Sequence, residues 1–210
     1  MKRSLASAEE SAAPYRHWRL SGLLPDEAIA QLQRIDFPPV DLGGVSGSRE
    51  VHNDQRHYFD AENKARFPVV AAIADAFQSP AGAGAVAAHF GADIEGTFLR
   101  IEHAQDSDGF WLKPHTDIGV KRFSLLLYVS DHPQHADLGT DIYAAADKWA
   151  KRQPFKPNHA LAFVPSTNTW HGFEKRPIVG VRKSMILNYV TDEWRAREQL
   201  AFPDKPISFS

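Results

Sequence analysis

The sequence predicts a mainly β fold, a sandwich or barrel, with a helical N-terminal third. Up to Gly91 the apolar residues recur at helical spacing, whereas from Ala92 onward short apolar segments alternate with turn residues. Two of these later segments also have one apolar face and one face of mixed polarity. Strands of that kind are expected where helices cover the outside of a sheet and a ligand-binding cavity lies inside.

The first expected helix opens at Pro25. The acidic pair that follows suits a first turn, and Ile29, Leu32 and Ile35 recur at three-residue spacing. The polar, small-residue-rich stretch before it, residues 1–14, is expected to be a flexible tail. The domain itself is therefore expected to span residues 15–210.

A second helix is expected to start at Pro68, because proline is favoured in the first turn of a helix. One face of this helix carries Val69, Ala72, Ile73 and Phe77. The alanine-rich stretch 84–90 predicts a third helix. Between the first two helices, residues 41–60 are rich in Gly, Asp and Asn and are expected to form a loop with a short strand, or a lid.

The β-rich core is expected at about residues 92–191, after helical support at about 15–91 and before a short C-terminal extension. The expected strands are Gly96–His103, Phe110–Lys113, Arg122–Ser130, Asp141–Ala144, Ala160–Val164, Thr169–Lys175 and Val181–Val190. In the last of these strands, one face is Val181, Met185, Leu187 and Tyr189, and the other is Arg182, Ser184, Ile186 and Asn188.

Composition excludes several classes of protein. The 210 residues suffice for one domain with a sizeable core, and the formal net charge of −2 provides no general attraction for nucleic acid or an anionic membrane. The absence of cysteine excludes disulfides, thiolate metal sites and iron–sulfur clusters, and leaves His, Asp and Glu as metal ligands. Because no signal-peptide core or membrane-spanning stretch stands out, a cytoplasmic protein is expected.

A His-x-Asp sequence at a strand end can supply two metal ligands, because residues i and i+2 point to the same side of a strand. Ten histidines in a chain of this composition give about one such pair by chance. Each pair in the chain must therefore be judged by the sequence around it. The chain contains three pairs, His52/Asp54, His115/Asp117 and His135/Asp137. Only the second follows a strand-like segment; the others lie in polar loops.

The third ligand of such a site must come from a distant strand. His171 lies in the aromatic-rich segment 169–173, and the following long strand carries Arg182 and Ser184 on one face. An inward arginine is costly to bury unless it meets an anion, and a guanidinium beside a hydroxyl is a good receptor for a carboxylate. A core Asp or Glu is the alternative partner of Arg182.

The order of His115 and Asp117, then His171, then Arg182 and Ser184 resembles that of the iron(II)- and 2-oxoglutarate-dependent oxygenases. The resemblance covers roughly residues 96 to 190. It implies that the two histidines and Asp117 are the catalytic metal ligands. It also implies that Arg182 and Ser184 bind the distal carboxylate of 2-oxoglutarate.

The resemblance further implies a double-stranded β-helix, or jelly roll, with helices packed on its major sheet. Fe(II), 2-oxoglutarate and O₂ would then be the cofactor and cosubstrates, and an unactivated C–H bond of a small molecule would be hydroxylated while 2-oxoglutarate is decarboxylated to succinate and CO₂. Related halogenases have a small residue in place of the carboxylate ligand. The presence of Asp117 therefore favours hydroxylation or desaturation over halogenation.

Four further residues are candidates for the site. Tyr128 lies on the mixed face of its strand, where similar enzymes have a polar residue that helps to hold the cosubstrate; the alternative is a tyrosine at the rim of the core. Arg100 and Asn188 could each contact the substrate. The alternatives are that Arg100 is simply exposed and that Asn188 is structural. Arg176 is a competing carboxylate anchor, but its surroundings indicate a solvated turn.

Two other functions remain open from the sequence. One is a non-catalytic jelly-roll binding module. The other is a cupin-like metal-dependent dioxygenase or isomerase that does not use 2-oxoglutarate. A nucleic-acid demethylase has no support from a basic, aromatic-rich segment, and no nucleic-acid or membrane partner is expected. The sequence carries no signal for the oligomeric state.

Overall fold

The computed structural model describes residues 2–48, 52 and 54–209. Its helices are α1 (Lys2–Ala6), α2 (Asp26–Arg34), α3 (Ala61–Arg66), α4 (Pro68–Gln78) and α5 (Pro80–Phe90), with 3₁₀ helices η2 (Pro133–His135) and η3 (Arg197–Gln199). Its strands are β1 (Glu9–Ser11), β2 (His17–Ser21), β3 (His57–Tyr58), β4 (Phe98–Asp106), β5 (Leu112–His115), β6 (Lys121–Tyr128), β7 (Asp141–Ala145), β8 (Lys148–Arg152), β9 (His159–Phe163), β10 (His171–Phe173) and β11 (Arg182–Val190).

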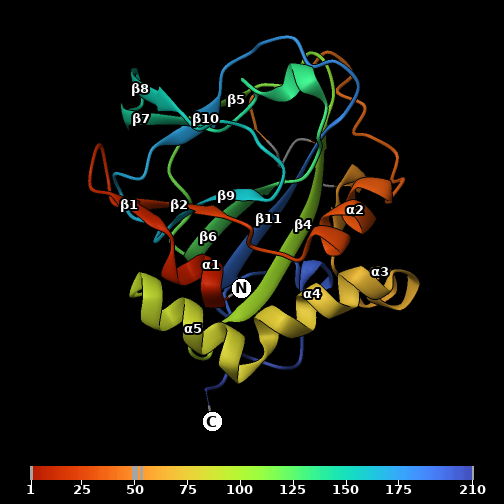
Figure 1. The fold of residues 1–210 in the computed structure, drawn as a ribbon, viewed down its shortest axis with the longest axis vertical. Helices are drawn as coiled ribbons and strands as arrows, with labels where there is room; N and C mark the ends of the chain where they lie inside the picture. Colours follow the sequence, from red (N-terminus) through yellow and green to blue (C-terminus); the bar gives the residue numbers. More distant parts are fainter. Residues whose placement is uncertain (1, 49–51, 53, 210) are drawn as a thin grey trace.

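Among the described residues these strands form two antiparallel sheets (Figure 1). The large sheet has seven strands in the order β1-β2-β9-β6-β11-β4-β3, and the small sheet has four in the order β5-β10-β7-β8. In the large sheet β11 lies between β4 and β6 and pairs with both over most of its length. Side chains on the inner faces of these three strands consequently lie close to one another.

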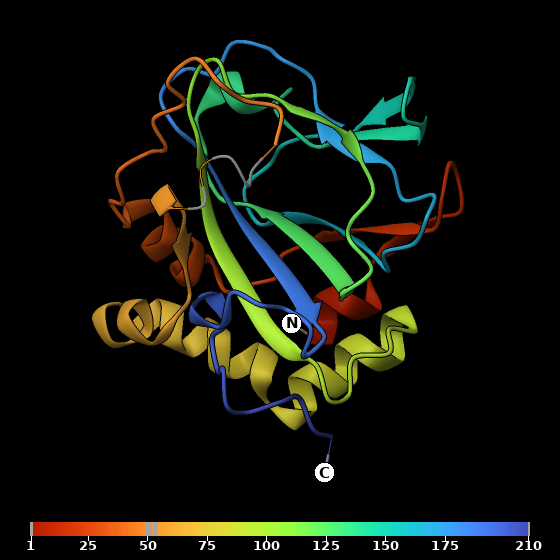
Figure 2. The same ribbon diagram turned by 180° about the vertical axis from the view of Figure 1, so that it is seen from behind.

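The main hydrophobic core lies between the outer face of the large sheet and the helices. Figures 1 and 2 show α3, α4 and α5 on one side of this sheet and the small sheet on the other. The core combines the outer-facing residues of β4, β6 and β11 with the buried faces of α2, α4 and α5. A mainly β fold with helical cover on one sheet is therefore confirmed, as the sequence predicted.

The helix starts follow local chemistry. Helix α2 begins directly after Pro25, and α4 begins at Pro68, where a missing N–H removes no intrahelical hydrogen bond. The face predicted for α4 was partly wrong, because Ala72 is exposed and Ala74 is buried in its place. The buried residues of this 11-residue helix are Val69, Val70, Ile73, Ala74, Phe77 and Gln78. Exposure of Ala72 costs little, because its side chain is a single methyl group.

Helix α5 begins at Pro80, earlier than the alanine-rich stretch suggested, because Ser79 caps it by accepting a hydrogen bond from the Gly82 N–H. A Cβ atom at Gly82 would lie 1.9 Å from the Ala76 carbonyl oxygen, so only glycine fits this sharp corner. No single helix of the described residues combines the length and apolar composition needed to cross a membrane, although α4 and α5, bent by 59°, reach them when joined.

The N-terminal third differs from the prediction in two ways. It is not purely helical, because β1, β2 and β3 also belong to it and extend the large sheet at both edges. Within residues 1–14, predicted to be a flexible tail, the structure places α1 and β1, and Leu5 lies in the main core. Because this stretch is mostly polar, its composition did not indicate that Leu5 packs in the core or that β1 forms an edge strand.

The seven predicted strands correspond to β4–β7 and β9–β11, with shifted ends. Strand β8 was not predicted, because its residues are largely exposed and show no apolar alternation. In the predicted loop 41–60, β3 is the short strand, and Gly47 forms an isolated bridge with Leu112. Residues 49–51 and 53 lie outside the described residues, so the lid stays a prediction.

Candidate metal centre

His115 and His171 lie directly opposite each other on the paired strands β5 and β10 of the small sheet. Their ring centroids are 4.4 Å apart. The Nδ1 atom of His115 lies 2.9 Å from the carbonyl oxygen of Lys113, and that of His171 lies 2.9 Å from the carbonyl oxygen of Thr169. Because a carbonyl only accepts, Nδ1 of each ring donates, and the Nε2 lone pair remains for another partner.

Asp117 follows β5 in the turn before β6, and its carboxylate is buried. Its Oδ1 atom accepts a hydrogen bond from the Lys121 ammonium at 2.6 Å, and its Oδ2 atom accepts one from the Ser124 hydroxyl. Burial alone would raise the pKa of Asp117. The charge of Lys121, the charge that His171 carries only at low pH and the two hydrogen bonds outweigh burial and hold this pKa well below its usual range. The carboxyl is therefore ionised at neutral pH.

These three side chains fit a divalent metal. One ligand atom from each lies within 4.8 Å of the other two. Burial lowers the pKa of His171 to about 4, so that its imidazole is neutral at pH 7 as a metal ligand must be. Two imidazoles and one carboxylate on adjacent vertices are the donor set of non-haem iron(II) sites with open coordination positions.

The other two His-x-Asp pairs lie away from this cluster, as the sequence context indicated. His135 is buried, with its ring nitrogens bonded to the Ser130 hydroxyl and the Val179 carbonyl, while Asp137 pairs with Arg152. His52 lies 2.9 Å from the carbonyl oxygen of Val45. Asn53, between the members of the first pair, lies outside the described residues.

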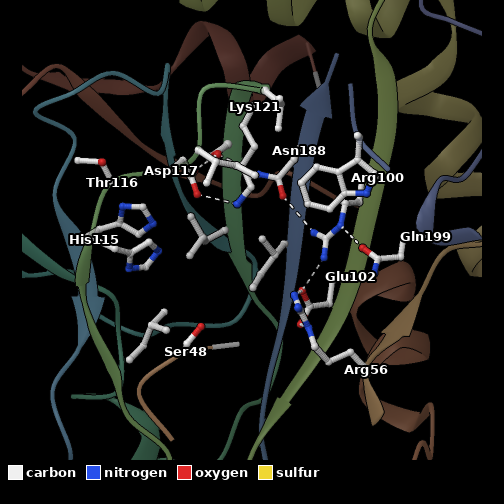
Figure 3. A pocket seen from close by; sticks show the side chains of 18 of the residues that line it. Ser48, Arg56, Arg100, Glu102, His115, Thr116, Asp117, Lys121, Asn188 and Gln199 are labelled. Carbon is white, nitrogen blue, oxygen red and sulfur yellow. Dashed lines mark hydrogen bonds and ion pairs between the residues drawn. The ribbon is translucent and has the colours of Figure 1, made fainter. Parts of the chain in front are cut away.

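A cavity of about 1230 Å³ opens beside the three residues, between the two sheets. Figure 3 shows His115 and Asp117 on one side of it and Arg56, Arg100 and Glu102 on the other. The predicted mixed face of β11 lines this cavity, with all four of its members present: Arg182, Ser184, Ile186 and Asn188. The predicted division of this strand into a core face and a cavity face is confirmed, except that Val181, predicted for the core face, lies before β11 and is only half-buried.

At one end of the cavity Arg182 is almost completely buried. It donates to the Asp106 carboxylate and, at 2.7 Å, to the Leu138 carbonyl. Its guanidinium lies 5.2 Å from the Phe155 ring centroid and 4.8 Å from that of Phe173. The alternative weighed from the sequence, a buried acidic partner for Arg182, is therefore present. This pairing orients the guanidinium at the cavity wall, where Ser184 and Thr140 also lie.

Tyr128 lies beside this end of the cavity. Its hydroxyl donates to the Thr140 hydroxyl at 3.1 Å and accepts from the Thr140 N–H. Arg176, the competing anchor, instead binds the Asp141 carboxylate and the carbonyl oxygens of Asp137 and Gly139. It does not line the cavity. Arg176 therefore links its own segment to residues 137–141, and the solvated surroundings that the sequence indicated for it were wrong, because its side chain is largely buried against Asp141.

The other end of the cavity is a buried network around Arg100. Its guanidinium donates to Gln199 at 2.9 Å, to Asn188 at 3.2 Å and to Glu102 at 3.5 Å. Glu102 is also bound through both carboxylate oxygens by Arg56. Arg100 and Asn188, the two residues expected to face the substrate, thus lie in one wall and touch each other.

Several residues of the site escaped sequence analysis. Lys121 and Ser124 contact Asp117, but no local motif marks them, because their proximity depends on how β6 meets the turn after β5. Arg56 and Glu102 meet only through the pairing of β3 with β4. Tyr15 is also buried, and its hydroxyl has no hydrogen-bond partner in the described structure. Its ring packs on Phe163, which contacts His171.

No family model and no curated protein sequence matches the chain. Solved structures do match. A prolyl 4-hydroxylase of Pseudomonas putida superposes with a TM-score of 0.61 at 16% identity, over 90% of this chain and 96% of that one. The chain has the fold of the iron(II)/2-oxoglutarate oxygenases.

Two further neighbours support the same fold. HygX of Streptomyces hygroscopicus, solved with nickel, 2-oxoglutarate and hygromycin B, matches with a TM-score of 0.53 at 13% identity, over 84% of this chain and 83% of that one. SnoN, a non-heme alpha-ketoglutarate-dependent epimerase from nogalamycin biosynthesis, matches with a TM-score of 0.52 at 13% identity, over 83% and 77%. The neighbours thus include proteins of more than one activity.

Proposed function

We propose that the protein is an iron(II)- and 2-oxoglutarate-dependent oxygenase that hydroxylates a C–H bond of a small polar molecule. The observation that carries this proposal is the convergence of His115, Asp117 and His171 to within 4.8 Å at the wall of a large cavity. The fold shared with HygX, which was solved with 2-oxoglutarate, supports the choice of cosubstrate. In this proposal the two sheets form a double-stranded β-helix.

The two histidines would hold iron through Nε2, and Asp117 would neutralise part of its charge. When bound, iron(II) and 2-oxoglutarate would activate O₂ as the oxidant. The cosubstrate then yields succinate and CO₂, and one oxygen atom of O₂ enters the substrate. The chain itself provides orientation and exclusion of water. Because His171 and Asp117 are buried, their geometry is set before a ligand arrives.

Arg182 and Ser184 would bind the far carboxylate of 2-oxoglutarate. Both line the cavity at the end closed by the apolar cluster of Phe110, Tyr128, Leu138, Phe155, Phe173 and Ile178. A charge-assisted hydrogen bond is stronger in such apolar surroundings than in water. Tyr128 would contribute indirectly, since it orients Thr140 at the cavity wall.

The opposite end of the cavity would hold the substrate. Arg56, Arg100, Glu102, Asn188 and Gln199 present donors and acceptors there, next to the Trp194 ring. This wall suits a molecule with several polar groups better than a hydrocarbon. Hygromycin B in the HygX structure is consistent with a polar occupant in a fold of this type.

The proposal is tested by anaerobic addition of Fe(II) and 2-oxoglutarate to the purified protein. We expect a visible charge-transfer band that is absent from His115→Ala and retained in His52→Ala, which alters a different His-x-Asp pair. A metabolite library read out by succinate formation then identifies the substrate.

Two results would count against the proposal. No band from the wild-type protein, despite bound metal, would favour a cupin-like enzyme that does not use a keto acid. An unchanged band in His115→Ala would refute the ligand assignment.

A further inference from the structure

Three side chains form a row across the cavity face of the large sheet. Asn188 on β11 lies directly opposite Arg100 on β4 and Ser124 on β6. All three are almost completely buried. Arg100 Nη1 lies 3.2 Å from Asn188 Oδ1, and Asn188 Nδ2 lies 2.9 Å from Ser124 Oγ. Ser124 in turn donates to Asp117, so the row ends at a metal ligand (Figure 3).

The direction of every hydrogen bond in this row is fixed by chemistry. A guanidinium only donates, so the Asn188 carbonyl oxygen must face Arg100 and its NH₂ group must face Ser124. The Ser124 oxygen then accepts from Asn188, and its single proton is directed to Asp117 Oδ2. The row therefore presents a donor, and never an acceptor, to the carboxylate.

Asp117 needs such support because it lies in a turn, outside any strand. Its two oxygens are held differently. Oδ1 is bound by the ammonium of Lys121, the long side chain of the first residue of β6, whereas Oδ2 is bound by the short side chain of Ser124 within the same strand. Both bonds tie the carboxylate to β6, but the second comes from a short side chain that is itself fixed by the Asn188 hydrogen bond, so it restricts the orientation of the carboxylate more closely.

We propose that Ser124 and Asn188 are positioning residues that hold Asp117 in the orientation in which it binds the metal, with Arg100 setting the direction of the row. The inference rests on the proposed metal centre and extends it to residues that contact no metal. It also joins the metal ligand to the wall of the cavity that would hold the substrate. Outer partners of this kind typically change metal affinity by about 10–100-fold.

The test is the affinity of the full-length protein for Co(II), measured by titration without 2-oxoglutarate. Ser124→Ala removes the donor, and we expect the dissociation constant to rise by about 10–100-fold. Ser124→Thr keeps the hydroxyl. Its dissociation constant for Co(II) is expected to stay within about threefold of the wild-type value, well short of the loss expected for Ser124→Ala. Ser130→Ala, which removes another buried hydroxyl, one that contacts His135 and the Lys183 N–H rather than Asp117, is the matched control and should leave Co(II) affinity unchanged.

Asn188→Asp separates positioning from charge. The new carboxylate has nearly the same shape but cannot donate to Ser124, whose proton would turn away from Asp117. An added negative charge would by itself tighten Co(II) binding, whereas loss of the row weakens it. Weaker binding, with a Co(II) absorption spectrum altered as in Ser124→Ala, supports the inference. Tighter or unchanged binding overturns it.

The outcomes also separate this inference from the proposed function. If the wild-type protein binds Co(II) with the expected dependence on Ser124, but Fe(II) and 2-oxoglutarate give no band, the row stands and the proposed function fails. If the band forms and Ser124→Ala binds Co(II) as wild type does, the inference alone fails. Absence of Co(II) binding by the wild-type protein overturns both. Circular dichroism of each variant verifies that it is folded.

Discussion

The two faces of β11 are equally buried but carry opposite kinds of side chain. Facing the helices are Met185, Leu187 and Tyr189, and facing the cavity are Arg182, Ser184 and Asn188. No member of either set is more than 3% exposed. The outer set packs as a hydrophobic core, whereas in the inner set Arg182 binds Asp106 and Asn188 bonds to Arg100 and Ser124.

This difference between the two faces indicates that the outer face serves the stability of the fold and the inner face serves its function. Burial of apolar side chains stabilises the fold in proportion to the area removed from water. A buried ion pair contributes little by comparison, since desolvation offsets most of the attraction, and well-packed apolar residues would often be as stable. The proposed function explains the polar inner face as a binding surface. Substitutions on the outer face should change stability, and those on the inner face should change activity.

The largest effect is expected at the metal centre. Asp117→Ala should lower succinate formation by about a thousandfold or more, because a missing metal ligand removes interactions worth several kcal/mol to the reacting state. The midpoint of thermal unfolding should change little, since Lys121 can turn towards solvent. Coupled assay of succinate and calorimetry measure the two quantities. Turnover above a tenth of the wild-type rate would contradict the ligand role.

The corresponding change on the outer face is Leu187→Ala. The side chain is completely buried in the main core, so its truncation should lower the free energy of unfolding by about 2–5 kcal/mol. Urea titration measures this loss. Co(II) affinity and turnover per folded molecule should equal those of the wild-type protein. A selective loss of activity without a loss of stability would break the comparison between the faces.

A smaller effect is expected at the cosubstrate end. Arg182→Met should raise the KM for 2-oxoglutarate by about 10–100-fold, the effect of removing a buried charge-assisted hydrogen bond. Arg176→Ala is the control, because that guanidinium binds Asp141 outside the cavity, and its KM should match that of the wild-type protein. A raised KM in Arg176→Ala and an unchanged KM in Arg182→Met would mean that Arg176, and not Arg182, binds the carboxylate of 2-oxoglutarate.

The smallest effect concerns His103, a buried polar residue on the helix-facing side of β4, opposite Met185 of β11. Burial lowers its pKa from 6.5 to about 4, and its Nε2 atom faces the Leu32 carbonyl. Between these two pH values the unfolded chain binds the proton and the folded chain does not. Stability should therefore fall as the pH decreases, by roughly 2 kcal/mol between pH 7 and pH 5 from this residue.

His103→Met removes this titration. Urea unfolding at both pH values should show a smaller acid-induced loss in the variant than in the wild-type protein, whatever its stability at pH 7. An identical loss in the two proteins would mean that other groups, such as His171, account for the acid sensitivity.

Much of the architecture was predictable because it depends on local patterns. Prolines marked the starts of α2 and α4, and alternation in β11 assigned each side chain to its face. Strands β1 and β8 were missed because edge strands bury too little to need apolar alternation. Leu5 alone could not reveal that α1 packs on the core, since a single leucine in a polar stretch forms no periodic pattern.

The candidate site was predictable only as far as motifs reach. The proposed metal ligands lie in a recognisable order, whereas the contacts of Ser124 and Lys121 with Asp117 depend on strand register and on the geometry of the loop before β6. The pairing of Arg182 with Asp106 likewise requires knowledge that β4 and β11 are neighbours, aligned at those two residues. Sequence reasoning could state that the arginine needs an anion, but the choice of anion is a property of the assembled sheet.

The alternation along β11 also bears on how such proteins diverge. Because successive residues serve different surfaces, replacement of Ile186 alters the cavity while the helix-facing residues keep the sheet in register. A lineage can therefore change the shape of its cavity on this strand without rebuilding its core. Neighbours at 16% and 13% identity to this chain share its fold and include a prolyl hydroxylase and an epimerase.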